Sequence, residues 1–255
     1  MASDGDPIIY AGAGFFGGLY LFYKGFTWLK LKKLIENMPT SKVRAIAMGL
    51  VEVYGEVVPY EKKLLKSPLL DKDCVYYSYS IQEERGSGKH RHWVTLKSGR
   101  EMVHFYLKDN TGEVLVDPEG ATVDMKADLN VTSSLGKDPP AAVMQALKRM
   151  KLSHDGFLGM NKTMRYTEYL VEPKDKLYIL GVAGDNPFVE DTKGQKNEED
   201  IMIQKGKHGD IYYLSDRNEK ELLKSLKWKS IGGVIGGAVL SLFCLTLIIA
   251  YFGLW

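Results

Sequence analysis

The sequence predicts an α+β membrane protein in which two transmembrane helices flank a mainly antiparallel β domain, either a barrel or a sandwich. Three observations support this prediction. Two long stretches carry no charged residue, one from Pro7 to Tyr23 and the other from Ser230 to Trp255. Between them, apolar and polar residues alternate in short segments, a pattern typical of half-buried strands. Glycine-containing turns separate these segments, as they do in small barrels and sandwiches.

The two charge-free stretches are long enough to cross a bilayer as helices. About 20 helical residues span a hydrocarbon core of roughly 30 Å. We therefore predict one transmembrane helix at residues 230–253. The other is predicted at 7–29, where the charged end of Lys24 can reach the headgroups. A cleaved signal peptide is the alternative for the first stretch. Asp4 and Asp6 precede that stretch and no small-residue cleavage site follows it, which argues against this alternative.

A short amphipathic segment is predicted beside each span. Residues 30–39 place leucines opposite lysines at helical spacing, which favours an interfacial helix over an ordinary core helix, and Pro39 ends it. Residues 216–229 are predicted to form a juxtamembrane helix that continues into the second span. Asp216 can cap this helix, with Glu219 three residues later.

The β domain is predicted at residues 40–215. Residues 97–100, Lys-Ser-Gly-Arg, are typical of a hairpin turn, so we expect two strands at 91–97 and 101–108. One helix is expected near residues 139–152, because two prolines occupy its first turn.

Lysine residues next to both predicted spans lie on the side of the domain. They are Lys24, Lys30, Lys32 and Lys33 after the first span, and Lys220, Lys224, Lys227 and Lys229 before the second. The positive-inside rule then places the domain in the cytoplasm and both termini on the opposite side. The two cysteines, Cys74 and Cys244, form no disulfide framework, which agrees with this assignment. Two Asn-X-Thr sequons point the other way but are short enough to arise by chance.

Several ordered segments of the sequence resemble one known family. They are Pro39–Val57, Ser67-Pro68, Cys74-Val-Tyr-Tyr77, Phe105-Tyr-Leu-Lys-Asp-Asn-Thr-Gly112, Glu168 and Leu177-Tyr-Ile-Leu-Gly181. Together with the flanking spans they resemble the GIDE family, the membrane-side domain of RING-type ubiquitin ligases of mitochondria and chloroplasts. The resemblance implies an anchored domain that binds substrates or regulators. It also implies that in eukaryotic relatives this domain faces an intermembrane space, which differs from the lysine-based assignment.

The same resemblance indicates which activity to expect. A RING finger holds two zinc ions with about eight Cys and His ligands. This sequence has two cysteines, and neither lies in a CxxC pair. The family's ligase residues therefore have no counterparts here, and we expect a member that lacks the RING finger and is not an enzyme.

The segment Gly12-Ala-Gly-Phe-Phe-Gly17 matches the G-x-G-x-x-G dinucleotide fingerprint. A Rossmann unit needs a buried strand before the motif and an acidic residue that ends a second strand. Glu36 has the right spacing, but it ends an amphipathic helix. We therefore interpret these glycines as helix-packing residues and predict no cofactor.

Small residues at four-residue spacing occur in both spans. The pairs are Gly14 and Gly18, Gly232 and Gly236, and Gly233 and Gly237. Such pairs let helix backbones approach closely. The first pair lies mid-span and the others at the domain-side end, an offset of very roughly 10 Å. We therefore expect at least one pair to contact a neighbouring chain and predict a homo-oligomer.

Two further clusters contain residue types that occur in metal or catalytic sites. His90, His92 and His104 are weak candidates for a zinc site if they lie on adjacent strands. Five histidines make a chance cluster easy, so no metal is predicted. His154 and Asp155 follow Ser153, but residues adjacent in sequence without a nucleophile elbow do not indicate a catalytic triad.

The function predicted from these observations is a non-catalytic, membrane-anchored scaffold or protein-interaction module that self-assembles in the membrane. Its expected partners are the lipid bilayer, further copies of itself and a protein. The net charge of +2 gives no electrostatic case for a nucleic acid. One alternative is a ligase-related function inherited from the family, either as an E3 or as a substrate-recruiting adaptor. The other is an enzyme with an unrecognised site in the β domain, which predicts a polar pocket with shifted pKa values.

Overall fold

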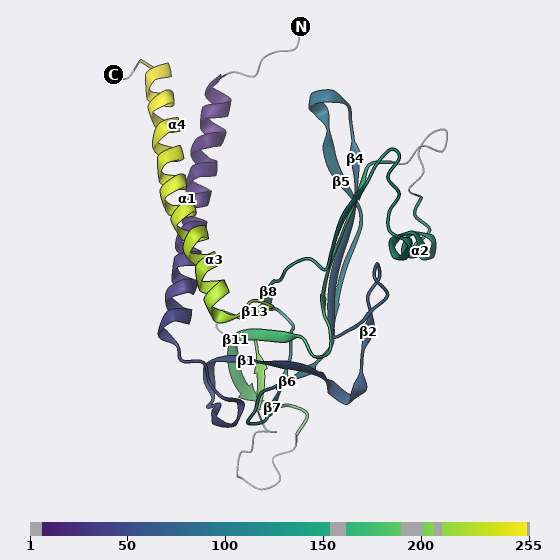
Figure 1. Cartoon of the computed structure of the whole chain (residues 1–255). Coiled ribbons are helices and arrows are strands. Elements are labelled where there is room, and N and C mark those ends of the chain that lie inside the picture. Colours follow the sequence, from purple (N-terminus) through teal and green to yellow (C-terminus); the bar gives the residue numbers. More distant parts are fainter. Residues whose placement is uncertain (1–6, 154–161, 190–200, 207–210, 254–255) are drawn as a thin grey trace. The chain divides into compact units, whose positions relative to one another are not determined.

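The computed structural model describes residues 7–153, 162–189, 201–206 and 211–253 (Figure 1). The chain divides into two compact units. One is helical and consists of Met1–Pro39 with Arg217–Trp255, and the other is the β domain, Thr40–Asp216. Each unit has its own packing and is described by itself.

The helical unit pairs α1 (Pro7–Asn37) with a long C-terminal helix. That helix consists of α3 (Glu219–Ile231), a π-helical turn at Gly232–Gly236 and α4 (Gly237–Tyr251). α1 packs along both α3 and α4. The N-cap of α3 is Asn218, whose side chain accepts a hydrogen bond from the Glu221 amide at 2.9 Å. The predicted cap, Asp216, instead accepts a hydrogen bond from the Lys126 amide within the β domain.

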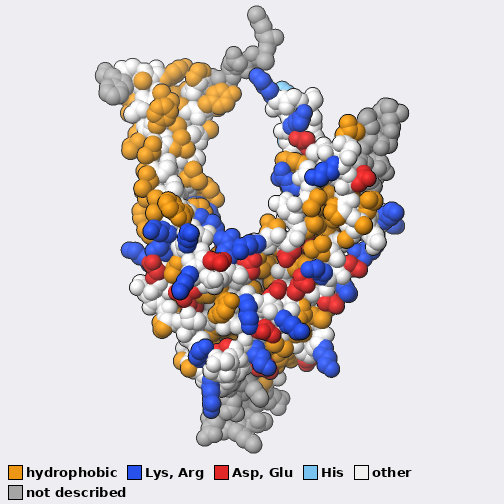
Figure 2. Space-filling view, viewed as in Figure 1, with side chains coloured by type: hydrophobic (Ala, Val, Ile, Leu, Met, Phe, Trp, Pro, Cys, Tyr) orange, Lys and Arg blue, Asp and Glu red, His pale blue; other side chains and the backbone are white. Residues whose placement is uncertain are grey.

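One helix of the described residues is long and apolar enough to cross a membrane, the 33-residue run Glu219–Tyr251, which we call the span. The prediction of two transmembrane helices is therefore wrong. α1 has sufficient length, but glycines, tyrosines and lysines interrupt its apolar residues and lower its average hydrophobicity. The space-filling view shows apolar side chains along the helical unit and lysines gathered at the end where α3 begins (Figure 2).

A closed barrel forms one half of the β domain. Its seven-stranded sheet has the order β1-β6-β7-β12-β11-β13-β8, and β1 pairs with β11 as well as with β6. The strands β1, β6, β7, β12 and β11 therefore close on themselves. The bounds are β1 Gly49–Pro59, β6 Phe105–Lys108, β7 Glu113–Val116, β8 Thr122–Asp124, β11 Lys176–Asp185, β12 Ile201–Gln204 and β13 Tyr213–Ser215. The pairs β7–β12 and β8–β13 are parallel, and the remaining pairs of this sheet are antiparallel.

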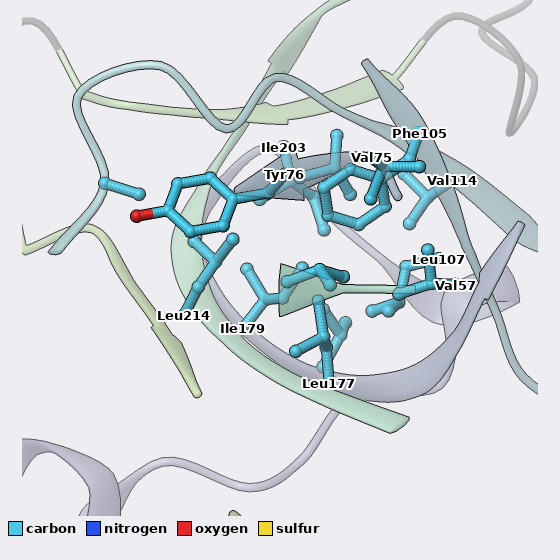
Figure 3. Close-up of a cluster of buried hydrophobic side chains, with 14 of the residues drawn as sticks. Val57, Val75, Tyr76, Phe105, Leu107, Val114, Leu177, Ile179, Ile203 and Leu214 are labelled. Atoms are coloured by element: carbon cyan, nitrogen blue, oxygen red, sulfur yellow. The ribbon is translucent and has the colours of Figure 1, made fainter. Parts of the chain in front are cut away.

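Alternate residues of these strands fill the barrel. Val57, Phe105, Leu107, Leu177 and Ile179 are at most 1% exposed and point toward one another (Figure 3). Such tight packing explains why a glycine occurs inside β1. A Cβ added to Gly55 would lie 2.6 Å from the Lys108 carbonyl oxygen, so the β1–β6 contact needs a residue without a side chain.

The other half of the β domain is a four-stranded antiparallel sheet with a helix on one face. Its order is β5-β4-β10-β9, with bounds β4 Tyr76–Arg85, β5 His92–Met102, β9 Leu129–Ser133 and β10 Met164–Val171. α2 (Ala141–Arg149) buries Val143, Ala146 and Leu147 against this sheet, forming a second core. The short strands β2 (Leu65–Lys66) and β3 (Asp73–Cys74) pair beside it, and 3₁₀ turns occur at Val43–Ala45, Tyr60–Lys62 and Gly88–His90.

The hairpin turn predicted at residues 97–100 is wrong. Those residues lie inside β5, which pairs with β4 along its whole length and carries one irregularity opposite Ile81 and Gln82. Gly99 does not turn the chain. It lies opposite Tyr79, where a Cβ would be 2.8 Å from the tyrosine ring. The glycine is therefore needed for a close side-chain contact, which the local sequence does not distinguish from a turn.

Candidate functional site

Glycines in α1 and in the span bring the two helix backbones into contact. A Cβ on Gly237 would lie 2.7 Å from the Gly18 carbonyl oxygen, and one on Gly233 would lie 2.7 Å from the Gly25 Cα. A Cβ on Gly14 would lie 2.6 Å from the Cys244 sulfur. The helix pair is thus held by small residues on facing sides.

The expected offset in depth between the glycine pairs is absent for Gly18 and Gly237. α1 is a single helix of 31 residues, so Gly18 lies well before its end and opposite Gly237. Two of the predicted glycines face elsewhere. Around Gly232 and Gly236 nothing among the described residues lies within 4 Å of an added Cβ. The four span glycines therefore divide into an inner pair that contacts α1 and an outer pair that does not.

The outer pair bounds the π-helical turn, Gly232–Gly236. A π turn inserts one residue into an α-helix and occurs frequently at functional sites. Apolar side chains continue the same face at helical spacing. Ile235, Val239, Leu242 and Phe243 are 60%, 62%, 63% and 60% exposed. We call Gly232, Ile235, Gly236, Val239, Leu242 and Phe243 the outer face of the span.

In the β domain, Glu168 joins a turn to the four-stranded sheet. Its carboxylate is buried and accepts hydrogen bonds from the amides of Leu69 and Leu70, both at 2.8 Å. Burial raises the pKa of Glu168, while the hydrogen bonds from Leu69 and Leu70 act in the opposite direction. The Ser67 hydroxyl closes the same turn by accepting from the Lys72 amide at 3.2 Å. Hydrogen bonds therefore connect Glu168 to the turn that contains the Ser67-Pro68 motif, so both have a structural role.

Asp109 organises another motif in the same way. Its carboxylate accepts hydrogen bonds from the amides of Thr111 at 2.6 Å, Gly112 at 3.1 Å and Val43 at 3.2 Å. Burial acts to raise the pKa of Asp109, but these hydrogen bonds and that from the Thr111 hydroxyl outweigh it and lower the pKa. The turn at 109–112 is thereby fixed to the segment before β1, so this motif also builds the barrel.

The three candidate zinc ligands do not come together. His90 and His92 lie at one end of β5, while His104 follows the other end. At about 3.3 Å per residue, these ends lie roughly 30 Å apart. The separation arises because residues 92–102 form one strand instead of two. Within the described residues, no group of three or more His, Cys, Asp or Glu side chains has a metal-binding arrangement.

The G-x-G-x-x-G segment lies entirely within α1, so it lacks the strand and turn of a nucleotide-binding unit. His154 and Asp155 lie outside the described residues.

Comparison with known families identifies the family to which this chain belongs. A family model described as GIDE, E3 ubiquitin ligase, matches residues 76–249, more than half of the chain. This chain belongs to the GIDE family. The match begins at β4 and ends in α4, so it covers part of each unit. No curated protein and no solved structure matches the chain.

The resemblance inferred from the sequence is thus confirmed, and GIDE membership makes this an E3-ligase-related protein.

Sequence reasoning missed two contact residues of the helix pair, Gly25 and Ser241. Gly25 lies against Gly233, and the Ser241 hydroxyl donates a hydrogen bond to the Phe15 carbonyl of α1 at 3.4 Å. The heptad spacing from Gly18 to Gly25 was the available signal, since residues seven apart share one helix face.

Proposed function

We propose that this GIDE protein is a membrane-anchored scaffold that self-assembles through the outer face of the span and presents its β domain to other proteins. The observation that carries the proposal is the division of the span glycines. One pair is used within the chain, and the other, Gly232 and Gly236, lies on an exposed apolar face with a π turn. Small residues at this spacing allow two helices to approach closely in lipid, where van der Waals packing drives association.

A matched pair of leucine substitutions tests self-assembly. Gly236→Leu leaves the α1 contact intact, because the added side chain meets open space, so it should shift the protein extracted in mild detergent to a smaller assembly. Gly17→Leu is the control on α1, since its Cβ also meets nothing within 4 Å. Mass measurement by light scattering gives the result. An unchanged mass for Gly236→Leu, or an equal loss with Gly17→Leu, would contradict assembly through this face.

We further propose that these 255 residues bind proteins without performing ligase chemistry. Two cysteines in separate units, Cys74 and Cys244, support this, because a RING needs paired ligands around each zinc. The family supports a second function, a substrate-recruiting adaptor. Affinity purification in mild detergent separates the two: a scaffold yields assemblies of this chain, while an adaptor yields a second protein in fixed ratio. Ubiquitin transfer by the purified chain would refute the non-catalytic proposal.

The lysines of α3 support a cytoplasmic β domain. Lys220, Lys224, Lys227 and Lys229 precede the apolar part of the span, on the side of the β domain. Protease added to right-side-out vesicles should leave the β domain intact, and the same protease should digest it after the vesicles are opened. Digestion in sealed vesicles would place the domain on the other side.

A further inference from the structure

A concave site lies on the outside of the barrel and includes Tyr106 and Gly112 of the 105–112 motif. Its volume is about 330 Å³. The lining residues come from the turn after β1, from β6 and β7 with the turn between them, and from the segment after β11. They are Tyr60, Tyr106, Gly112, Glu113, Leu115, Asn186, Phe188 and Val189. All of these belong to the β domain, so the site does not depend on how the two units are placed.

Three aromatic rings form one side of this site. The Tyr60 ring centroid lies 5.5 Å from that of Tyr106 and 6.2 Å from that of Phe188, with the ring planes tilted by 59° and 36°. His104 supports the group from behind, because its ring packs edge-on against Phe188 at 5.2 Å and does not line the site. Phe188 is 55% exposed, so its ring is accessible to a ligand from solvent.

The charge of the lining is negative. Glu113 is the one lining residue that carries a charge at neutral pH, and the lining contains no lysine or arginine. The Lys63 ammonium lies 5.8 Å from the Tyr60 ring centroid, but it pairs with the Glu61 carboxylate at 2.7 Å and does not line the site. Aromatic faces attract cations through the ring quadrupole, and several rings around one point form the cages that recognise quaternary ammonium groups.

We propose that Tyr60, Tyr106, Phe188 and Glu113 form a binding site for a trimethylammonium group. The rings supply cation–π attraction and apolar contact with the methyl groups, and the Glu113 carboxylate supplies the countercharge. Both a soluble ligand and a phospholipid headgroup can carry this group, and each would present the same chemistry to the site. This site is independent of self-assembly by the span, so either proposal can fail without the other.

The test compares choline with its neutral carbon analogue, 3,3-dimethylbutan-1-ol, on the full chain in phosphatidylglycerol nanodiscs. The two ligands have the same shape, so a difference in affinity reports the charge. We expect choline to bind about tenfold more tightly, the size of one desolvated cation–π contact. Equal affinities would show a merely apolar pocket and overturn the proposal, as would the absence of saturable choline binding in calorimetry and NMR.

Leucine variants separate the ring contribution from the apolar contribution. Tyr60→Leu and Phe188→Leu should each lower choline affinity several-fold while changing the affinity for the neutral analogue little. Glu113→Gln should weaken choline binding only. Tyr54→Leu is the matched control, because Tyr54 is an exposed tyrosine of β1 that does not line this site. A loss of choline binding in Tyr54→Leu equal to that in Tyr60→Leu would overturn the assignment.

A second arm identifies the source of the group. The choline titration is repeated in phosphatidylcholine nanodiscs. A lower apparent affinity there means that lipid headgroups occupy the site, whereas an unchanged affinity means that the site takes a soluble ligand.

Discussion

Glu168 illustrates how one buried charge is tolerated in the β domain. Removing a carboxylate from water disfavours its ionised form, and burial is the largest influence on the pKa of this residue. The two amides of the 69–70 turn compensate in part, because each donates a hydrogen bond to a carboxylate oxygen. Glu168 is therefore a structural residue whose protonation affects folding.

We predict that Glu168→Gln removes a pH-dependent part of the stability. Because the folded pKa is raised, the stabilisation from this group is fully present below its ordinary value of 4.5 and is lost as the pH rises through the folded pKa. Glutamine does not titrate, so the variant should lose less stability than the parent between pH 4.5 and pH 7. Chemical denaturation at both pH values measures this difference, and an identical pH dependence in both proteins would contradict the prediction.

Glu168→Leu tests the hydrogen bonds rather than the charge. Leucine leaves the Leu69 and Leu70 amides without their acceptor, and a buried unsatisfied group costs about 1–3 kcal/mol. Because two amides lose their acceptor, we expect the free energy of unfolding to fall by about 2–6 kcal/mol at pH 7. Thermal and urea unfolding followed by circular dichroism provide the measurement. Unchanged stability would mean that water or other groups replace the carboxylate.

Gly99 shows where residue-scale inference fails. Serine and glycine between two charged residues are typical of a turn, but in the structure the ladder from β4 continues past them. The Tyr79 ring occupies the space that a Cβ at Gly99 would need. The partner strand that decides between these conformations lies about 20 residues earlier, and a local pattern carries no information about it.

At the scale of elements, the pairing of α1 with α4 depends on which glycines face each other. Gly14 faces Cys244, and Gly18 faces Gly237. The number and spacing of glycines in the sequence indicate close helix packing but do not assign partners. Which glycines face each other depends on the register of the two antiparallel helices. Because the whole β domain separates these helices in the sequence, their connection does not fix that register.

We predict that Gly14→Cys forms a disulfide with Cys244. An added Cβ at position 14 would lie 2.6 Å from the Cys244 sulfur, so a small side-chain adjustment reaches bonding geometry. Mild oxidation in detergent should produce a faster-migrating monomer on a non-reducing gel. Gly12→Cys is the control, because its Cβ contacts nothing within 4 Å. Equal cross-linking of both variants would indicate mobile helices without a fixed register.

At the scale of the whole molecule, the β domain has two cores of its own. One fills the barrel and the other lies between the four-stranded sheet and α2. Strands β1 and β11 close the barrel, although about 120 residues of sequence separate them. Such long-range closure leaves few unpaired edges and gives the domain a compact form of its own.

We predict that residues 40–216 fold without the helical unit. Both cores lie inside this range, so its unfolding should be cooperative and its Tm close to that of the β domain in the full chain. Circular dichroism and differential scanning calorimetry of the isolated fragment make the comparison. A fragment that aggregates or melts without cooperativity would show that contacts with the helices are needed for folding.

The sequence by itself determined the membrane character of the C-terminal helix, the mainly β domain and the family. Hydrophobic length and strand alternation are local properties, and the order of the GIDE motifs is a property of the linear chain. Only the tertiary structure decided that five strands close a barrel. It also decided that β5 is unbroken and that Gly233 and Gly237 contact α1 while Gly232 and Gly236 do not. These outcomes depend on which distant segments meet, and packing between them selects among conformations that the local sequence leaves nearly equal in energy.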